Sequence, residues 1–228
     1  MKSDFLTKLA SVDVCLDDHT YGLFETYYEA LIAWNETMNL TAITNKDDVF
    51  MKHFFDSLSL AKVVSFNNQT LLDVGSGAGF PGVPLKLVFP SLHLTIVDAQ
   101  KKRLAFLEHL TKELNIDVSI MHERAETMPI VSGYDVVTAR AVAPLNILTE
   151  LCLPHVKRGG LFIAMKGKDA DKELEQSQNA IEVLGGHVEN VLEYEVMGLQ
   201  RKLLVIRKNN ETPKPYPRPY HQIKKRPL

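Results

Sequence analysis

The sequence predicts an α/β fold in which a mostly parallel, Rossmann-like sheet is covered by helices and preceded by a helical N-terminal extension. Three observations predict it. Short apolar strands alternate with helical segments from Thr70 to about residue 208, as in parallel sheets with right-handed crossovers. A glycine-rich turn directly follows the first strand, at Gly75 to Gly79. No alternating strand pattern occurs before Thr70.

Composition sets the broad class of the protein. Hydrophobic residues make up 45% of the 228 residues and charged residues 24%, which is ordinary for a globular chain with a packed core. The absence of any run of 18 apolar residues predicts no membrane span. The N-terminus has an early acid and no apolar signal core, so we expect a cytoplasmic protein. Cys15 and Cys152 form no metal-binding pattern and are expected to be reduced thiols.

The first 64 residues are expected to form a helical region. Apolar residues between Tyr21 and Trp34 recur at helical spacing. A second helix is expected over 46–63, capped by Asn45 or Thr44. Residues 65–208 then form the expected main domain.

The main domain begins with strand 71–74 and a helix starting near Pro81, a residue favoured in the first turn. The remaining segments are expected in the order strand 92–97, helix 101–114, strand 118–121, strand 134–138, helix 145–156, strand 161–165, helix 169–184, and a terminal hairpin of 188–196 and 203–206. Gly159 and Gly160 are expected to end the helix before them. With the antiparallel hairpin, the sheet should have seven strands.

Residues 209–228 contain five prolines and are expected to form an extended, mobile arm. From Arg207 to the end the chain carries a net charge of +6, against −8 for the rest. A basic segment with interleaved tyrosines suits RNA, although a terminal segment without a role is the alternative.

The glycine turn and two acids indicate a cofactor that contains adenosine. Gly75-x-Gly77-x-Gly79 lets a ligand approach bare backbone, and Asp98 ends the next strand, where a carboxylate can bind ribose hydroxyls. Asp73, two residues before the turn, would repel a pyrophosphate but suits an ammonium group. These features favour S-adenosylmethionine over a nicotinamide or flavin cofactor, or a turn without a ligand.

Five segments carry a resemblance to a known family. They are Trp34-Asn35-x-x-x-Asn39-Leu40-Thr41-Ala42-Ile43, His53-x-x-Asp56-Ser57-Leu58, Asp73 to Gly82 with its Phe80-Pro81-Gly82 extension, Arg124-Ala125-Glu126, and Tyr134 to Ala141. The sequence resembles the bacterial small-subunit ribosomal RNA methyltransferase G (GidB) family. This resemblance implies a class I SAM-dependent methyltransferase that modifies N7 of one guanine in a loop of 16S rRNA. It also implies 16S rRNA, the small ribosomal subunit or its assembly intermediate as partner. We expect a monomer.

Site roles follow partly from the residues and partly from the resemblance. Gly75 and Gly77 should admit the methionine part of S-adenosylmethionine and Asp98 its ribose. The resemblance assigns Phe80, Ala125, Glu126 and Arg140 to the same cofactor. Guanine N7 needs no deprotonation before attack, so no catalytic residue is assigned and no metal is expected.

Other polar residues have both structural and functional interpretations. His53 and Asp56 are three residues apart on one helix and are expected to hydrogen bond within the protein. Lys166 is expected to meet RNA or solvent, and so is the basic run Lys101 to Arg103. A methyltransferase with another substrate, or a non-catalytic assembly factor that binds S-adenosylmethionine, stays open as an alternative.

Overall fold

The computed structural model describes residues 2–130 and 133–228. Its centre is a seven-stranded sheet in the order β3-β2-β1-β4-β5-β7-β6, in which β7 runs antiparallel to β5 and β6. The strands are β1 (Thr70–Val74), β2 (His93–Asp98), β3 (Ser119–His122), β4 (Tyr134–Arg140), β5 (Val156–Lys166), β6 (Gly186–Val196) and β7 (Leu199–Lys208). This confirms the predicted α/β class and the terminal hairpin.

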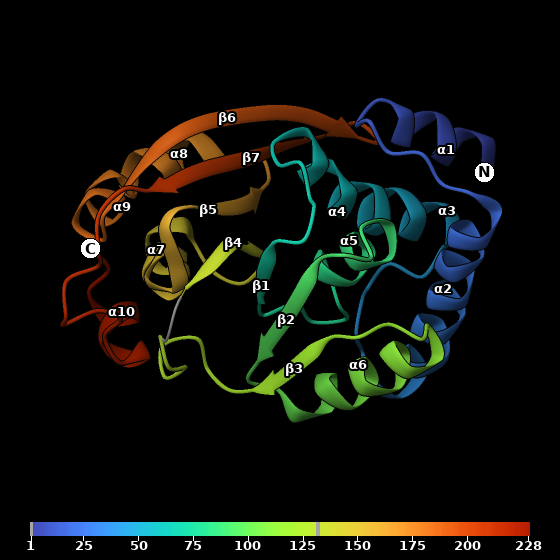
Figure 1. Cartoon of the computed structure of the whole chain (residues 1–228), viewed down its shortest axis with the longest axis horizontal. Helices are drawn as coiled ribbons and strands as arrows, with labels where there is room; N and C mark the ends of the chain where they lie inside the picture. The colour runs from blue at the N-terminus through green and yellow to red at the C-terminus, as the bar shows by residue number, and fades with distance from the viewer. Residues whose placement is uncertain (1, 131–132) are drawn as a thin grey trace.

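Helices cover both faces of the sheet, so the molecule has three layers (Figure 1). The α-helices are α1 (Lys2–Ala10), α2 (Asp18–Met38), α3 (Lys46–Val49), α4 (Asp56–Leu58), α5 (Gly82–Val88), α6 (Lys101–Glu113), α7 (Leu145–Cys152), α8 (Ala170–Gln176), α9 (Gln178–Val183) and α10 (Tyr220–Lys225). In the view of Figure 1, α2, α5 and α6 lie to the right of the sheet and α7, α9 and α10 to its left. None of the helices in the described ranges is long and apolar enough to cross a membrane.

The two layers of helices bury separate apolar clusters. Alternate strand residues point to opposite faces, so Leu71 joins the cluster beneath α2 and α6, whereas Leu72 joins the one beneath α7. The same alternation separates Leu203 from Leu204 on β7. At the central strands β1 and β4 both faces of the sheet are therefore buried, so polar ligands can reach these strands at their ends.

The N-terminal helices pack on one of these faces. Asn45 caps α3 by accepting a hydrogen bond from the Asp48 N–H. The helix then widens into a π-helical turn, Phe50–Phe55, where the Asp56 N–H reaches back five residues to the Met51 carbonyl. It continues through α4 and ends in a 3₁₀ turn at Lys62. The expected helix over 46–63 is thus present, but its hydrogen bonding changes in the middle.

Two expectations about the second half of the chain were wrong. Gly159 and Gly160 do not end a helix but lie within β5, which begins at Val156. A Cβ on Gly160 would lie 2.7 Å from the Asp135 carbonyl oxygen of neighbouring β4, so glycine there permits close approach of the strands. The expected helix 169–184 is divided at Ser177 into α8 and α9; the Ser177 hydroxyl donates to the Glu173 carbonyl.

The expectation of an extended C-terminal arm was also wrong. Residues 220–225 form α10, and Ile223 is fully buried in the cluster beneath α7. Arg218 donates to both carboxylate oxygens of the completely buried Glu150, at 2.8 and 2.5 Å. The sequence pattern missed this docking because the partner, Glu150, lies 68 residues away.

Candidate active site

The parallel strands end at one edge of the sheet, and the chain order reverses there between β1 and β4. Ligands of open α/β sheets bind at such a switch point, outside the carboxyl ends of the strands. β1 leads into Gly75 and β2 ends at Asp98. β4 ends at Arg140 and β5 at Lys166. The sheet thus brings together residues that are up to 91 positions apart.

The glycine turn after β1 is shaped by positive φ angles. Gly75 has φ 70° and Gly77 φ 62°, which favour glycine because it lacks a Cβ. A Cβ on Gly75 would lie 2.8 Å from Val142 Cγ2. A Cβ on Gly77 would meet nothing among the described atoms within 4 Å. The turn is therefore packed against the β4 loop at Gly75 and open at Gly77.

Asp73 does not face the open side of this turn, so the expectation that it receives the ammonium group was wrong. Its carboxylate is fully buried, and Oδ2 accepts a 2.8 Å hydrogen bond from the Gly82 N–H. Oδ1 has no hydrogen-bond partner among the described residues. Burial raises the pKa of Asp73 to about 7. The residue holds the start of α5 beneath the turn.

Asp98 lies in a cleft of about 360 Å³ beside the turn. One carboxylate oxygen accepts from the Gly77 N–H at 3.2 Å and the other from the Gln100 N–H at 2.8 Å. Arg103 contacts the same carboxylate at 3.4 Å. A carboxylate has about four acceptor positions, so Asp98 keeps capacity for the hydroxyls of a ligand.

Ala125 and Glu126 line the same cleft, which we call the Asp98 cleft. His155 contacts the Ala125 carbonyl at 2.7 Å and fixes this loop from below. Glu126 accepts from Arg124 Nε at 2.6 Å, and its side chain is only 6% exposed. This loop follows β3, the neighbour of β2 in the sheet. It therefore places its backbone and the Glu126 carboxylate, which is paired with Arg124, in the same cleft as Asp98 at the end of β2.

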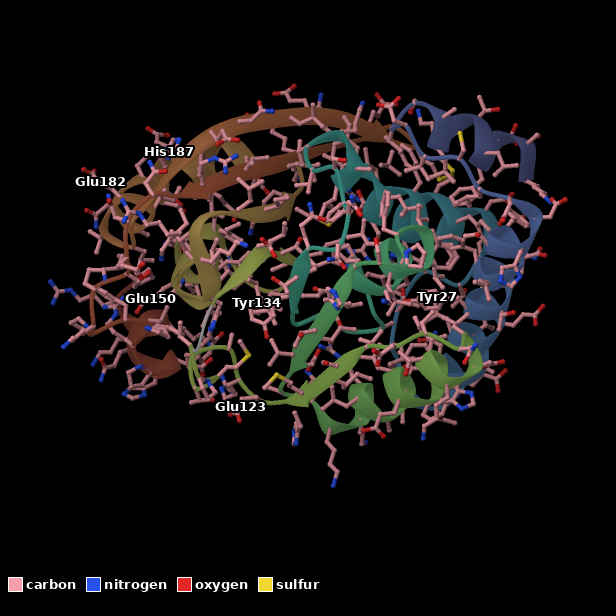
Figure 2. All side chains as sticks on the ribbon, viewed as in Figure 1. Tyr27, Glu123, Tyr134, Glu150, Glu182 and His187 are labelled. Carbon is pink, nitrogen blue, oxygen red and sulfur yellow. The ribbon has the colours of Figure 1, made fainter. Side chains whose placement is uncertain are left out.

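Phe80 is largely buried under a smaller niche of about 160 Å³ that Gly75 and Gly77 also line. Its ring stacks on Tyr27 at 5.4 Å and on His53 at 4.6 Å between centroids. Tyr27 in turn donates to the Ala78 carbonyl at 2.6 Å; Figure 2 shows it in the helical layer beside the turn. Phe80 therefore supports the floor of the niche from the core.

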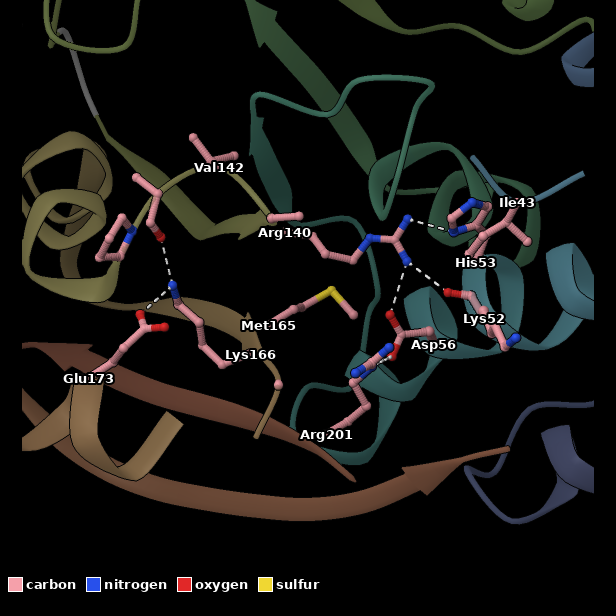
Figure 3. Close-up of a pocket in the computed structure, with 14 residues that line it drawn as sticks. Ile43, Lys52, His53, Asp56, Arg140, Val142, Met165, Lys166, Glu173 and Arg201 are labelled. Atoms are coloured by element: carbon pink, nitrogen blue, oxygen red, sulfur yellow. Dashed lines mark hydrogen bonds and ion pairs between the residues drawn. The ribbon is translucent and has the colours of Figure 1, made fainter. Parts of the chain in front are cut away.

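Arg140 joins the niche to a larger cavity. Nη1 donates to Asp56 Oδ2 at 2.9 Å and to the Lys52 carbonyl at 3.2 Å. Nη2 contacts His53 Nδ1 at 3.2 Å, and the guanidinium lies 4.9 Å from the centre of the Phe80 ring. Figure 3 shows the contacts of Arg140 on β4 with Lys52, His53 and Asp56 of the helix that holds the π-helical turn. The predicted hydrogen bonding of His53 and Asp56 within the protein is thereby confirmed.

His53 is an uncharged hydrogen-bonding group. Burial, followed by the positive charge of Arg140, lowers the pKa of His53 to about 3. Because Arg140 can only donate, Nδ1 must accept, which leaves the proton on Nε2. Nε2 then donates to Thr41 Oγ1, 2.8 Å away.

The larger cavity has a volume of about 550 Å³ and is rich in charge. Four cationic side chains line it, against two carboxylates: Lys52, Arg140, Lys166 and Arg201, with Asp56 and Glu173. Lys166 Nζ contacts the Ala143 carbonyl and Glu173, each at 2.7 Å (Figure 3). An ammonium has three donors, so one stays available to a ligand. We call this space the cation-lined cavity.

The cleft, the niche and the cavity meet at Ala141, which lines all three. Ala141 has φ 57°, a left-handed conformation that is uncommon for alanine and typical of functional turns. The sequence-predicted cofactor residues divide between two of these spaces: the niche is lined by Gly75, Gly77, Phe80 and Arg140, and the cleft by Asp98, Ala125 and Glu126. The chain contains no cluster of three potential metal ligands within the ranges 2–130 and 133–228.

The lining residues that the sequence interpretation missed include Thr41, Lys52, Arg201 and Tyr220. Thr41 belongs to a quoted motif and Lys52 directly precedes one, so membership in or proximity to a motif was the available signal. Arg201 reaches the site through the antiparallel pairing of β7 with β5, and Tyr220 through the docked tail. Neither of these contacts has a local sequence signature.

Comparison of structures supports the fold. A methyltransferase from Pyrococcus furiosus aligns with a TM-score of 0.58 at 14% identity, over 80% of this chain and 95% of that one. A ribosomal protein L11 methylase from Lactobacillus delbrueckii subsp. bulgaricus aligns with a TM-score of 0.53 at 17% identity, over 70% and 79% of the two chains. The fold is that of the class I methyltransferases.

Comparison of sequences is more specific. Relatives named ribosomal RNA small subunit methyltransferase G include one from Staphylococcus carnosus, 49% identical over 97% of this chain and 96% of the relative. Another, from Bacillus subtilis, is 46% identical over 94% and 93%. The model of the GidB family, described as rRNA small subunit methyltransferase G, matches residues 20–204. This chain therefore belongs to the GidB family.

Proposed function

We propose that this chain transfers the methyl group of S-adenosylmethionine to N7 of a guanine in 16S ribosomal RNA. The observation that carries the proposal is the junction at Ala141, where the Asp98 cleft, of about 360 Å³, and the cation-lined cavity meet. The names of the relatives support ribosomal RNA as the substrate. In this proposal residues 65–208 form the catalytic domain, 1–64 a helical extension, and 209–228 a basic, proline-rich tail that docks on the catalytic domain.

The residues present fit S-adenosylmethionine. Asp98 has acceptor capacity for ribose hydroxyls, and Ala125 and Glu126 lie where adenine would extend from that ribose. The open side of Gly77 leaves room for the methionine part. When bound, the cofactor supplies an activated methyl group. The protein's task is to hold that group at the junction.

The cation-lined cavity suits a guanine that has been turned out of an RNA loop. The free donor of Lys166 can orient an acceptor such as guanine O6 while N7 stays accessible. N7 carries a lone pair, so the neutral His53 is not needed as a base. Methyl transfer moves the positive charge of the sulfonium onto the ring, and Asp56 and Glu173, which pair with Arg140 and Lys166, limit the repulsion from the cations of the cavity.

The remaining cations suit the phosphates of the RNA. Arg201 lies at the cavity rim, 3.7 Å from Asp56, and its side chain is partly exposed. Replacing it by alanine should weaken RNA binding and lower the salt dependence by about one unit of slope. The proposed enzyme acts as a cytoplasmic monomer on the small ribosomal subunit or its assembly intermediate.

The test is transfer of tritiated methyl from S-adenosylmethionine to 16S rRNA, free and in small subunits that lack the modification. N7-methylguanosine should be the labelled nucleoside. Asp98→Asn should raise the KM for the cofactor about ten-fold or more, whereas Asp117→Asn, an exposed carboxylate elsewhere, should not. Label in another nucleoside would refute the assignment of N7. Binding of cofactor and RNA without transfer would indicate the non-catalytic assembly factor.

A further inference from the structure

The Asp98 cleft has one wall that comes from outside the region matched by the family model. That match ends at residue 204, whereas Tyr220 at the start of α10 lines the cleft. It does so with Asp98 and Glu126, and with Leu151 from α7. The C-terminal segment is thus part of the surface that meets the ligand.

A chain of contacts joins Tyr220 to the loop after β3. The Arg124 guanidinium lies 4.9 Å from the centre of the Tyr220 ring, within the range of a cation–π interaction. The other side of this guanidinium pairs with Glu126 at 2.6 Å. One face of the cleft is therefore built by tail and loop together.

The tail is held in this place by the protein interior. Arg218, two residues before Tyr220, forms the ion pair with buried Glu150; Figure 2 shows Glu150 beside α10. The Arg218 backbone N–H donates to the same carboxylate at 2.8 Å. Ile223, three residues after Tyr220, has no exposed surface. Anchors on both sides fix the tyrosine at the cleft.

We propose that Tyr220 forms a wall for the adenosine part of the cofactor, so that docking of the tail and cofactor binding stabilise each other. The inference rests on the proposed function, because it takes the ligand of the cleft to be S-adenosylmethionine. An aromatic ring beside a purine adds favourable contact without needing its hydroxyl. The tail thereby acts on the cofactor rather than as a free RNA-binding arm.

The direct test is the dissociation constant of S-adenosylmethionine for the full chain, measured by calorimetry. Tyr220→Ala should weaken binding roughly three- to ten-fold, the range expected for loss of one aromatic contact. Tyr220→Phe should restore binding to within about two-fold, since no hydrogen bond of the hydroxyl is present among the described residues. The affinity of Tyr220→Ala for S-adenosylhomocysteine should fall by the same factor, because both ligands carry the same adenosine group and the replaced ring lies beside it.

A matched control separates the wall from the charge of the tail. Lys224 and Lys225 are exposed and do not line the cleft. Their double replacement by alanine should leave cofactor binding unchanged. In the methylation assay, Tyr220→Ala should raise the KM for the cofactor and leave kcat unchanged at saturation.

Reciprocity provides an independent measurement. A ligand that contacts the docked tail must slow its opening, so saturating cofactor should slow hydrogen exchange in 220–226 of the wild type. In Tyr220→Ala this protection should be reduced. A fall in cofactor affinity without any protection of 220–226 would overturn the coupling.

The outcomes also separate this inference from the proposed function. If wild type and Tyr220→Ala bind the cofactor equally well, the inference about the tail is overturned, whereas the proposed function is not. Tight cofactor binding with no methylation of 16S rRNA would overturn the proposed function and leave the wall intact. A wild-type chain that binds no S-adenosylmethionine would overturn both.

Discussion

Replacement of Asp73 by asparagine should remove a specific pH dependence from the stability of the protein. The side chain is fully buried, and only one of its oxygens is hydrogen bonded among the described residues. Burial raises its pKa from 3.8 to about 7. An asparagine has the same shape, and its carbonyl oxygen can still accept from the Gly82 N–H.

The sign of the effect follows from proton linkage. Between pH 4 and 7 the unfolded chain releases the Asp73 proton while the folded chain retains it, so stability falls as pH rises. Each pH unit in that interval costs about 1.4 kcal/mol, and the loss is complete above the folded pKa. From pH 5 to pH 8, Asp73 should therefore lower the free energy of unfolding by about 3 kcal/mol.

The assay is urea unfolding of wild type and Asp73→Asn at several pH values, followed by circular dichroism and by fluorescence of the single tryptophan, Trp34. The difference in unfolding free energy, variant minus wild type, should grow by about 3 kcal/mol between pH 5 and 8. Glu175→Gln, which removes an exposed negative charge from α8, serves as the control. Parallel pH profiles for wild type and Asp73→Asn would refute a raised pKa at this site.

Three further outcomes are expected. Arg140→Ala should raise the pKa of His53 above its value of about 3 but keep it below 6.5, because burial is the larger cause; an imidazole titration by NMR that shows no rise would contradict this. Gly77→Ala should weaken S-adenosylmethionine binding at least ten-fold but lower unfolding stability by only about 1–2 kcal/mol, the cost of alanine at positive φ; calorimetry and urea unfolding check both, and unchanged affinity would show that the turn does not meet the ligand. Arg218→Ala should lower the free energy of unfolding by about 3 kcal/mol, because it leaves Glu150 buried without its cation; a loss below about 0.5 kcal/mol in urea unfolding would mean that the tail does not depend on this pair.

The central elements could be predicted because their signals are local. The strand ending at Val74, the glycine turn and the strand ending at Asp98 each have a short pattern of apolar residues and glycine. Parallel strands place their carboxyl ends at one edge, so the meeting of Gly77 and Asp98 followed from the pattern. Their 3.2 Å hydrogen bond is the structural result.

The features that could not be predicted depend on distant partners. Gly160 looks like a helix stop until the close approach of β4 is known. The prolines of the tail predict an extended chain, and only the buried carboxylate of Glu150 explains why it docks. Asp73 looks like a ligand-binding acid because a sequence shows its spacing but not the direction of its side chain.

The π-helical turn at Phe50–Phe55 sets the angle between two parts of the site. Its wider turn accommodates one residue more than an α-helix would, and each residue of an α-helix advances the chain by about 100°. Deleting one residue there would close the wide turn into a regular α-helix, which keeps the flanking helical segments in register but changes the direction of the side chains inside the turn relative to Asp56. His53 and Asp56 could then no longer reach Arg140 together. The number of residues in this turn is therefore more tightly constrained by geometry than the identity of each residue. Conservative substitutions in the turn should be tolerated, whereas deletion of a single residue should not.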